Sequence, residues 1–165
     1  NQWHFGLKAH IGADSDSGAV HSVHVTAANE SDVANAHHLL HGDEKHVHAD
    51  AGFTGVEKRD EVKAAQQQGR IKADVNWHVA ERRHKIKVMP EGLTKELTQA
   101  LERVKAQIRA RVEHPFHIVK NLFGHKKLRY RGLVKNGAQL TVMFALANLV
   151  LLKRPLLTLQ GIGAP

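Results

Sequence analysis

The stretch WHFGLKAHIGADSDSGAVHSVHVTA, residues 3–27, decides the first part of the fold. Its first run, 3–11, alternates in part between apolar and polar residues. Its second run, 19–27, sets valines among small or polar neighbours. The segment between them, GADSDSG, is rich in the residue types that form tight turns. Two such runs joined by a turn are typical of a β-hairpin, so we expect one here.

Beyond the hairpin, helices and strands are expected to alternate. Asn29 or Ser31 can cap a helix through VANAHHLLHG that Gly42 ends, and KHVHA at 45–49 is typical of a short strand. The pattern then predicts a helix over 54–68, a strand over 71–80, an irregular basic insertion over 81–92 and a long helix from about Thr94. This order predicts a mixed α/β domain with helices packed on a sheet.

Two apolar helices are expected in the second half of the chain. Apolar residues recur in the first of them at intervals of three and four, which places them on one helical face: Leu97, Leu101, Val104, Ile108 and Val112. The second, over 138–152, is expected to be shorter than the about 20 apolar residues of a membrane span. It also contains Asn148 and other polar residues, so we expect a core or docking helix.

Composition and charge narrow the classes of function. The chain has 165 residues and no cysteine, which excludes a disulfide framework, a thiolate zinc site and a cysteine nucleophile. Residues 1–80 hold 7 Lys/Arg and 11 Asp/Glu, whereas residues 81–165 hold 17 and 5. This asymmetry indicates that the C-terminal half faces a polyanion, for which nucleic acid is the first candidate, or else presents a solvated basic face.

Asp50 is the first candidate for a chemical role. It stands where the short strand at 45–49 ends and Ala51-Gly52 turns the chain. A carboxylate at the C-terminal end of a strand points into the crevice where open α/β sheets bind ligands. The alternative is that Asp50 caps the helix that follows.

Glu113 is the second candidate, on the long helix. Arg109 lies four residues before it and Lys120 seven after, so the three share one helical face, apart from the apolar stripe. The alternative is a surface ion-pair cluster. Pro115 lacks the amide hydrogen that would bond the carbonyl of Arg111, so we expect a kink or restart there.

Two further segments are candidate binding surfaces. KKLRYRGLVKN, at 126–136, interleaves basic residues with Tyr130, which predicts a DNA-backbone surface or else a solvated basic loop. Ten of the 14 histidines lie in residues 1–80. His37 and His41, four apart on the expected helix, could bind Zn²⁺ or Ni²⁺, or else be half-exposed polar positions. In the segment 126–136, the side chains that we expect to bind DNA are Lys126, Lys127, Arg129 and Arg131.

Together these segments carry a resemblance. The stretch IRARVEHPFHIVKNLFGHKKLRYRGLVKNGAQL, at 108–140, has an Arg, three residues, a Glu, six residues and a Lys in order. With ADAGFTG at 49–55, NQWHFGLKAHIGAD at 1–14 and VTAANESD at 25–32, it resembles the DDE transposases of the insertion-sequence five (IS five) group. The resemblance covers nearly the whole chain. It departs from related groups at Ala106, where they have a Tyr.

The resemblance implies a fold, a cofactor and roles. The fold would be a ribonuclease H-like mixed sheet flanked by helices over residues 1–152, followed by a tail at 153–165. Carboxylates would hold two Mg²⁺ (or Mn²⁺) ions for DNA strand cleavage and transfer. Asp50 would be the second acid and Glu113 the third, while Arg109 and Lys120 would contact DNA phosphate.

The resemblance also places the first acid on a strand before the hairpin. Since the sequence starts at Asn1, we expect a fold lacking that first strand and a fragment inactive by itself. Asp14 and Asp16 are poor substitutes, because they lie in the hairpin turn. The expected partners are DNA at transposon ends and targets and a second copy in a homodimer, with no membrane, in a bacterial cytoplasm near the nucleoid. The alternatives are a non-catalytic DNA-binding remnant and a His-rich metal-binding module.

Overall fold

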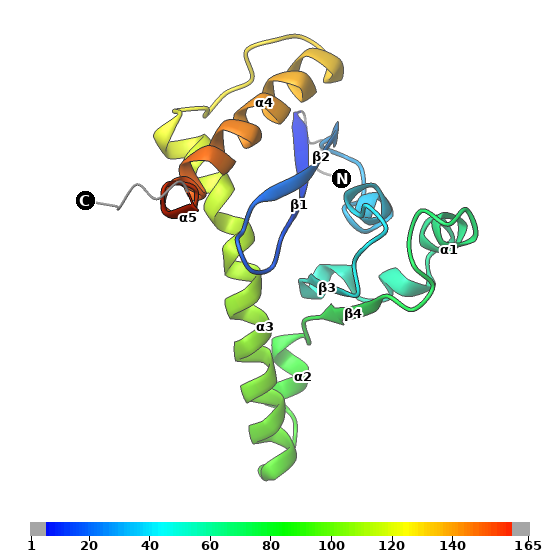
Figure 1. The fold of residues 1–165 in the computed structure, drawn as a ribbon. Coiled ribbons are helices and arrows are strands. Elements are labelled where there is room, and N and C mark those ends of the chain that lie inside the picture. Colours follow the sequence, from blue (N-terminus) through cyan, green and yellow to red (C-terminus); the bar gives the residue numbers. More distant parts are fainter. Residues whose placement is uncertain (1–5, 160–165) are drawn as a thin grey trace. The chain divides into compact units, whose positions relative to one another are not determined.

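The computed structural model describes residues 6–159, which form two compact units (Figure 1). Unit 1 comprises Asn1–Glu30 with Arg111–Pro165, and unit 2 comprises Ser31–Ala110. Each unit holds one two-stranded sheet among the described residues, and helices account for most of the remaining regular structure. The chain is therefore a mixed α/β protein, as the sequence predicts.

The hairpin of unit 1 is confirmed. Strands β1 (Leu7–Ala13) and β2 (Val20–Ala27) pair antiparallel, with a bulge near the turn at Gly12/Ala13. Asp14 fastens the turn, because its Oδ1 accepts the Ser17 amide at 2.7 Å and the Ser17 hydroxyl at 2.7 Å. Gly18 has φ +73°, a left-handed conformation that glycine adopts without strain. The part of the predicted first run before residue 6 lies outside the described residues.

Helix α4 (Leu133–Leu151) covers this hairpin and forms the core of unit 1 with it. Phe144 is 1% exposed and meets the Phe116 ring edge-on, with 5.3 Å between the ring centroids. Asn148 joins the helix to the strand: its Nδ2 donates to the Val20 carbonyl at 2.7 Å, and its Oδ1 accepts the Val20 amide at 2.8 Å. The side chain of Asn148 thus satisfies the backbone of β2 as a neighbouring strand would.

The long helix α3 (Leu93–His117) leads into a π-helical turn, Ile118–Leu122. Pro115 is buried and lies inside α3, which continues past the proline without a restart. The helix instead changes its hydrogen-bonding pattern just after it, which is a common way for a helix to accommodate an irregularity. Ile118 and Val119 in this turn are buried in the core of unit 1.

Unit 2 is built on a parallel pair. Strands β3 (His46–Ala49) and β4 (Asn76–Val79) run in the same direction, with His48 opposite His78. The connection between them contains the one-turn helices η2 (Ala51–Phe53) and η3 (Val56–Lys58) and then helix α1 (Asp60–Gln67). Two apolar clusters form the core of unit 2, one around Val56 and Val62 and the other around Ala65 and Ile71.

Several predicted boundaries are corrected. The segment expected as a helix through 33–42 is a 3-10 helix, η1 (Val33–Leu39), and the strand expected over 71–80 is only β4. The helix expected over 54–68 is divided between η3 and α1. The insertion 81–92 contains the short helix α2 (Arg83–Lys87), and the tail carries α5 (Lys153–Leu159). In each case backbone hydrogen bonding begins or ends where side-chain patterning alone gives no signal.

The two apolar helices also differ from expectation. The stripe on α3 is not buried along its length, because Leu97 is 61% and Leu101 55% exposed. Helix α4 begins at Leu133 rather than residue 138 and has 19 residues. Within the described residues it alone is long and apolar enough to cross a membrane, by length and composition. The core helix of a soluble protein can have the same length and composition.

The two hydrogen bonds between the Asn148 side chain and the Val20 backbone predict a large effect of Asn148 on stability. Substituting Asn148→Ala leaves the Val20 amide and carbonyl without their partner, so we expect the free energy of unfolding to fall by about 2 kcal/mol. Urea unfolding measures it. Thr141→Ala is the matched control on the same helix, since its hydroxyl bonds only the Gly137 carbonyl of that helix and should cost less than about 0.5 kcal/mol. Equal losses in both variants would refute the anchoring role.

Candidate catalytic site

Asp50 stands directly after strand β3 and begins the 3-10 turn η2. Its Oδ1 accepts the Gly52 amide at 2.7 Å, so the capping interpretation is confirmed. A Cβ on Gly52 would lie 2.9 Å from that Oδ1, which explains why glycine suits this position. Asp50 is exposed, and its Oδ2 carries no bond within residues 6–159. One carboxylate oxygen therefore orients the side chain while the other stays free for a ligand.

Basic side chains of α3 reach the same end of the parallel pair. Lys105 Nζ donates to the Val79 carbonyl, the last residue of β4, at 3.0 Å and to Glu102 at 2.8 Å. Both members of this ion pair have only 15% of their side chain exposed. The ammonium thus ties α3 to the sheet of unit 2.

Arg109 lies one turn further along α3. It is half-buried, and its Nε donates to the Lys105 carbonyl at 3.3 Å. Burial, then the neighbouring charges of His78, His46, Lys105 and Arg109, lower the pKa of His48, which precedes Asp50 by two residues.

Glu113 and Lys120 belong to unit 1 and are both exposed. Glu113 is on α3, and Lys120 is on the π-helical turn, with its Nζ 5.7 Å from the centroid of the Phe116 ring. This aromatic face holds the ammonium on the exposed side of the turn. Because Asp50 lies in unit 2 and Glu113 in unit 1, a metal site common to both stays a prediction.

The basic loop 126–131 is exposed throughout, including Tyr130, which is 51% exposed. Asn136, on the first turn of α4, fixes the base of this loop. Its side chain is 1% exposed and donates to the carbonyls of Tyr130 and Gly132, each at 2.7 Å. The loop 126–131, which Asn136 holds at its C-terminal end, thus exposes the four predicted DNA-binding side chains: Lys126, Lys127, Arg129 and Arg131.

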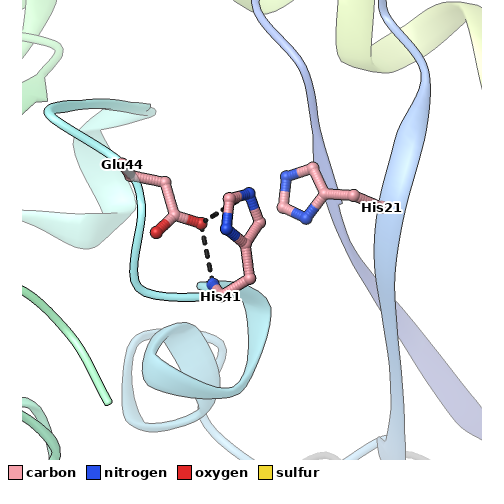
Figure 2. A group of neighbouring side chains, drawn as sticks. All are labelled: His21, His41 and Glu44. Atoms are coloured by element: carbon pink, nitrogen blue, oxygen red, sulfur yellow. Dashed lines mark hydrogen bonds and ion pairs between the residues drawn. The ribbon is translucent and has the colours of Figure 1, made fainter. Parts of the chain in front are cut away.

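The His37–His41 metal pair is not supported. His41 lies outside η1, after the extended residue Leu40, so the two rings do not lie one α-helical turn apart. His37 Nδ1 instead bonds the Ala34 carbonyl at 2.9 Å. Glu44 contacts His41 twice (Figure 2): its Oε1 accepts a hydrogen bond from the His41 amide at 2.8 Å and lies 3.3 Å from the His41 Nε2. The third residue drawn, His21, belongs to unit 1. The His41–Glu44 contacts close a loop.

Asp14 has a structural role in the hairpin turn. Hydrogen bonds from the Ser17 amide and hydroxyl lower the pKa of its carboxyl, against a smaller opposing effect of burial. Both bonds go to Oδ1, so the carboxylate is oriented by the turn itself. Asp14 therefore fastens the hairpin.

Two residues of this region were not found from the sequence: Lys105 and Asn136. Both act through backbone carbonyls, of Val79 in one case and of Tyr130 and Gly132 in the other. Carbonyl partners leave no trace in residue type or spacing.

The family model described as Transposase DDE domain matches residues 1–149, so the chain belongs to the DDE transposase family. The family match confirms the resemblance at this level. DDE transposase domains depend on divalent metal ions and act on DNA. Among solved structures, none matches this chain.

The tie between α3 and β4 can be tested with Lys105→Met. Removing the ammonium leaves the Val79 carbonyl and the Glu102 carboxylate without their partner, which should cost about 1–3 kcal/mol locally. Hydrogen exchange of the β3 and β4 amides measures this loss as faster exchange. Lys95→Met is the control, because Lys95 pairs only with the exposed Glu91. Unchanged exchange in the Lys105 variant would contradict the tie.

Proposed function

We propose that this chain supplies part of the catalytic site of an IS five-group DDE transposase, which cleaves and joins DNA strands at transposon ends. The observation that carries the proposal is the family match over residues 1–149 together with Asp50 at the end of β3. Lys105 of α3 bonds the carbonyl that ends the neighbouring strand β4. In this assignment Asp50 is the second acid and Glu113 the third.

The donor chemistry fits a hard divalent ion. Asp50 offers a free carboxylate oxygen and Glu113 an exposed carboxylate, and oxygen ligands suit Mg²⁺ or Mn²⁺. When bound, such ions activate the attacking hydroxyl and stabilise the leaving oxygen of a phosphodiester. The cap from the Gly52 amide fixes the Asp50 carboxylate before any ion arrives, which lowers the conformational cost of binding.

The basic residues are assigned to DNA. Lys120 and Arg109 would contact DNA phosphates near the cleaved bond, and the loop 126–131 would contact the DNA backbone on either side. Lysine and arginine neutralise phosphate charge without reading sequence. The loop contributes Lys126, Lys127, Arg129 and Arg131.

The remaining parts of the proposal follow from the family resemblance. We infer a ribonuclease H-like arrangement whose first acid is none of the described residues, so that the 165-residue chain is inactive in cleavage by itself. A homodimer acting in a bacterial cytoplasm completes this proposal. A DNA-binding remnant without catalysis is the second candidate, favoured by the exposed basic loop.

The metal ligands can be mapped with Fe²⁺ in place of Mg²⁺. With ascorbate and peroxide, bound Fe²⁺ cuts the backbone near its ligands, so we expect fragments from cuts near residues 50 and 113. Excess Mg²⁺ should suppress both cuts. Asp50→Asn and Glu113→Gln should each abolish them, because the amide is a far weaker metal ligand than the carboxylate.

Asp50→Asn is a clean variant, since asparagine also caps helices and keeps the bond from Gly52. Its urea unfolding should match that of the parent chain. Cuts that persist in both variants would refute the metal assignment. Mg²⁺-dependent nicking of supercoiled plasmid by the chain alone, above the Asp50→Asn background, would refute the proposed inactivity.

The DNA assignment predicts a change in salt dependence for Lys120→Gln. Loss of one phosphate contact should lower the slope of log K against log salt by about 0.9 on duplex DNA. Fluorescence anisotropy with a labelled 30-base-pair duplex of arbitrary sequence measures it. Lys58→Gln, an exposed lysine of the acidic half, serves as the control and should leave the slope unchanged. An unchanged slope for Lys120→Gln would exclude a phosphate contact.

A further inference from the structure

Three histidines lie on one face of the parallel pair in unit 2. His46 and His48 are two residues apart on β3, so their side chains point to the same face. His78 on β4 is directly opposite His48 in the register. The sequence separates His78 from the other two by about 30 residues, and only the parallel pairing brings them together.

The nitrogen atoms of two of these rings face each other. His46 Nδ1 and His78 Nε2 are 3.0 Å apart and share a hydrogen bond. With metal–nitrogen distances of about 2.0–2.1 Å, this spacing corresponds to an angle of about 95° at a bound ion. Angles near 90° suit the square-planar or octahedral geometry of Ni²⁺ and Cu²⁺ rather than tetrahedral Zn²⁺.

The surroundings hold the His78 ring in position and in its neutral form. His48 stacks on His78, with 4.7 Å between ring centroids and 17° between planes. Burial, then the charges of His46 and Lys105, lower the pKa of His78. A neutral imidazole is the form that binds metals. The positive charge of Lys105 is compensated by the Glu102 carboxylate at 2.8 Å, which reduces its repulsion of a cation.

We propose that His46 and His78 form a two-nitrogen site for a late divalent transition metal, with Ni²⁺ as the probe ion, and that water fills the remaining positions. On binding, the proton between the rings moves to the outer nitrogen of its own imidazole. Both facing nitrogens then carry free lone pairs, and no net proton is released. This site uses nitrogen ligands and is independent of the carboxylate assignment of Asp50 and Glu113.

The test is isothermal titration of the tag-free 165-residue chain with Ni²⁺. We expect one ion per chain, and loss of affinity by at least about tenfold in each of His46→Ala and His78→Ala, since removing a ligand costs more than removing an outer-shell partner. His46 is exposed, so His46→Ala should retain the fold, and circular dichroism confirms it. His84→Ala, at an exposed histidine of α2, is the matched control and should bind as the parent does.

The proposal is wrong if His37 and His41 bind the Ni²⁺ ion instead. Loss of the Ni²⁺ site in a His37→Ala/His41→Ala double variant, with binding kept in His46→Ala, would overturn it. So would the absence of any stoichiometric binding to the parent chain. Because Asp50→Asn and Glu113→Gln leave both rings in place, retained Ni²⁺ binding there separates this site from the proposed catalytic metals.

Discussion

Unit 2 depends on the parallel pairing of β3 with β4. Parallel strands cannot be joined by a tight turn, so the chain must cross over between them, and residues 50–75 make that crossing. The pairing places the ends of both strands at the same edge. Asp50 leaves that edge from β3, and the carbonyl of Val79 offers an acceptor there from β4. The surroundings of Asp50 and the row of histidines both follow from this one register.

Polar side chains that are buried or half-buried connect the remaining elements. Asn148 satisfies the backbone of Val20, Asn136 ties the basic loop, and Lys105 holds α3 to β4. Each satisfies main-chain groups that would otherwise lose hydrogen bonds on leaving water, which gives these contacts directional control that apolar packing lacks. The small sheets of this protein have few strands to bond one another, so side chains take over part of that role.

Local patterns predicted the local elements. The hairpin at 7–27, the strand at 46–49 and the long helix were found because alternation, turn residues and a three-to-four repeat act within a few residues. The helix through 33–42 was wrong in type, because a 3-10 helix and an α-helix show similar patterns over seven residues. The repeat placed Leu97 and Leu101 on one face of the helix, but both are exposed, since a stripe states which residues share a face and not whether anything covers it.

The sequence by itself determined the family, the hairpin, the charge asymmetry and the identity of Asp50 and Glu113 as candidate acids, because these rest on residue type and short spacing. Tertiary structure decided which residues meet. It brought Lys105 to the carbonyl that ends β4, placed His78 beside His46, and engaged Asp14 in a turn. Such contacts depend on strand register and on backbone carbonyls, and neither is encoded in the side-chain pattern of any single segment.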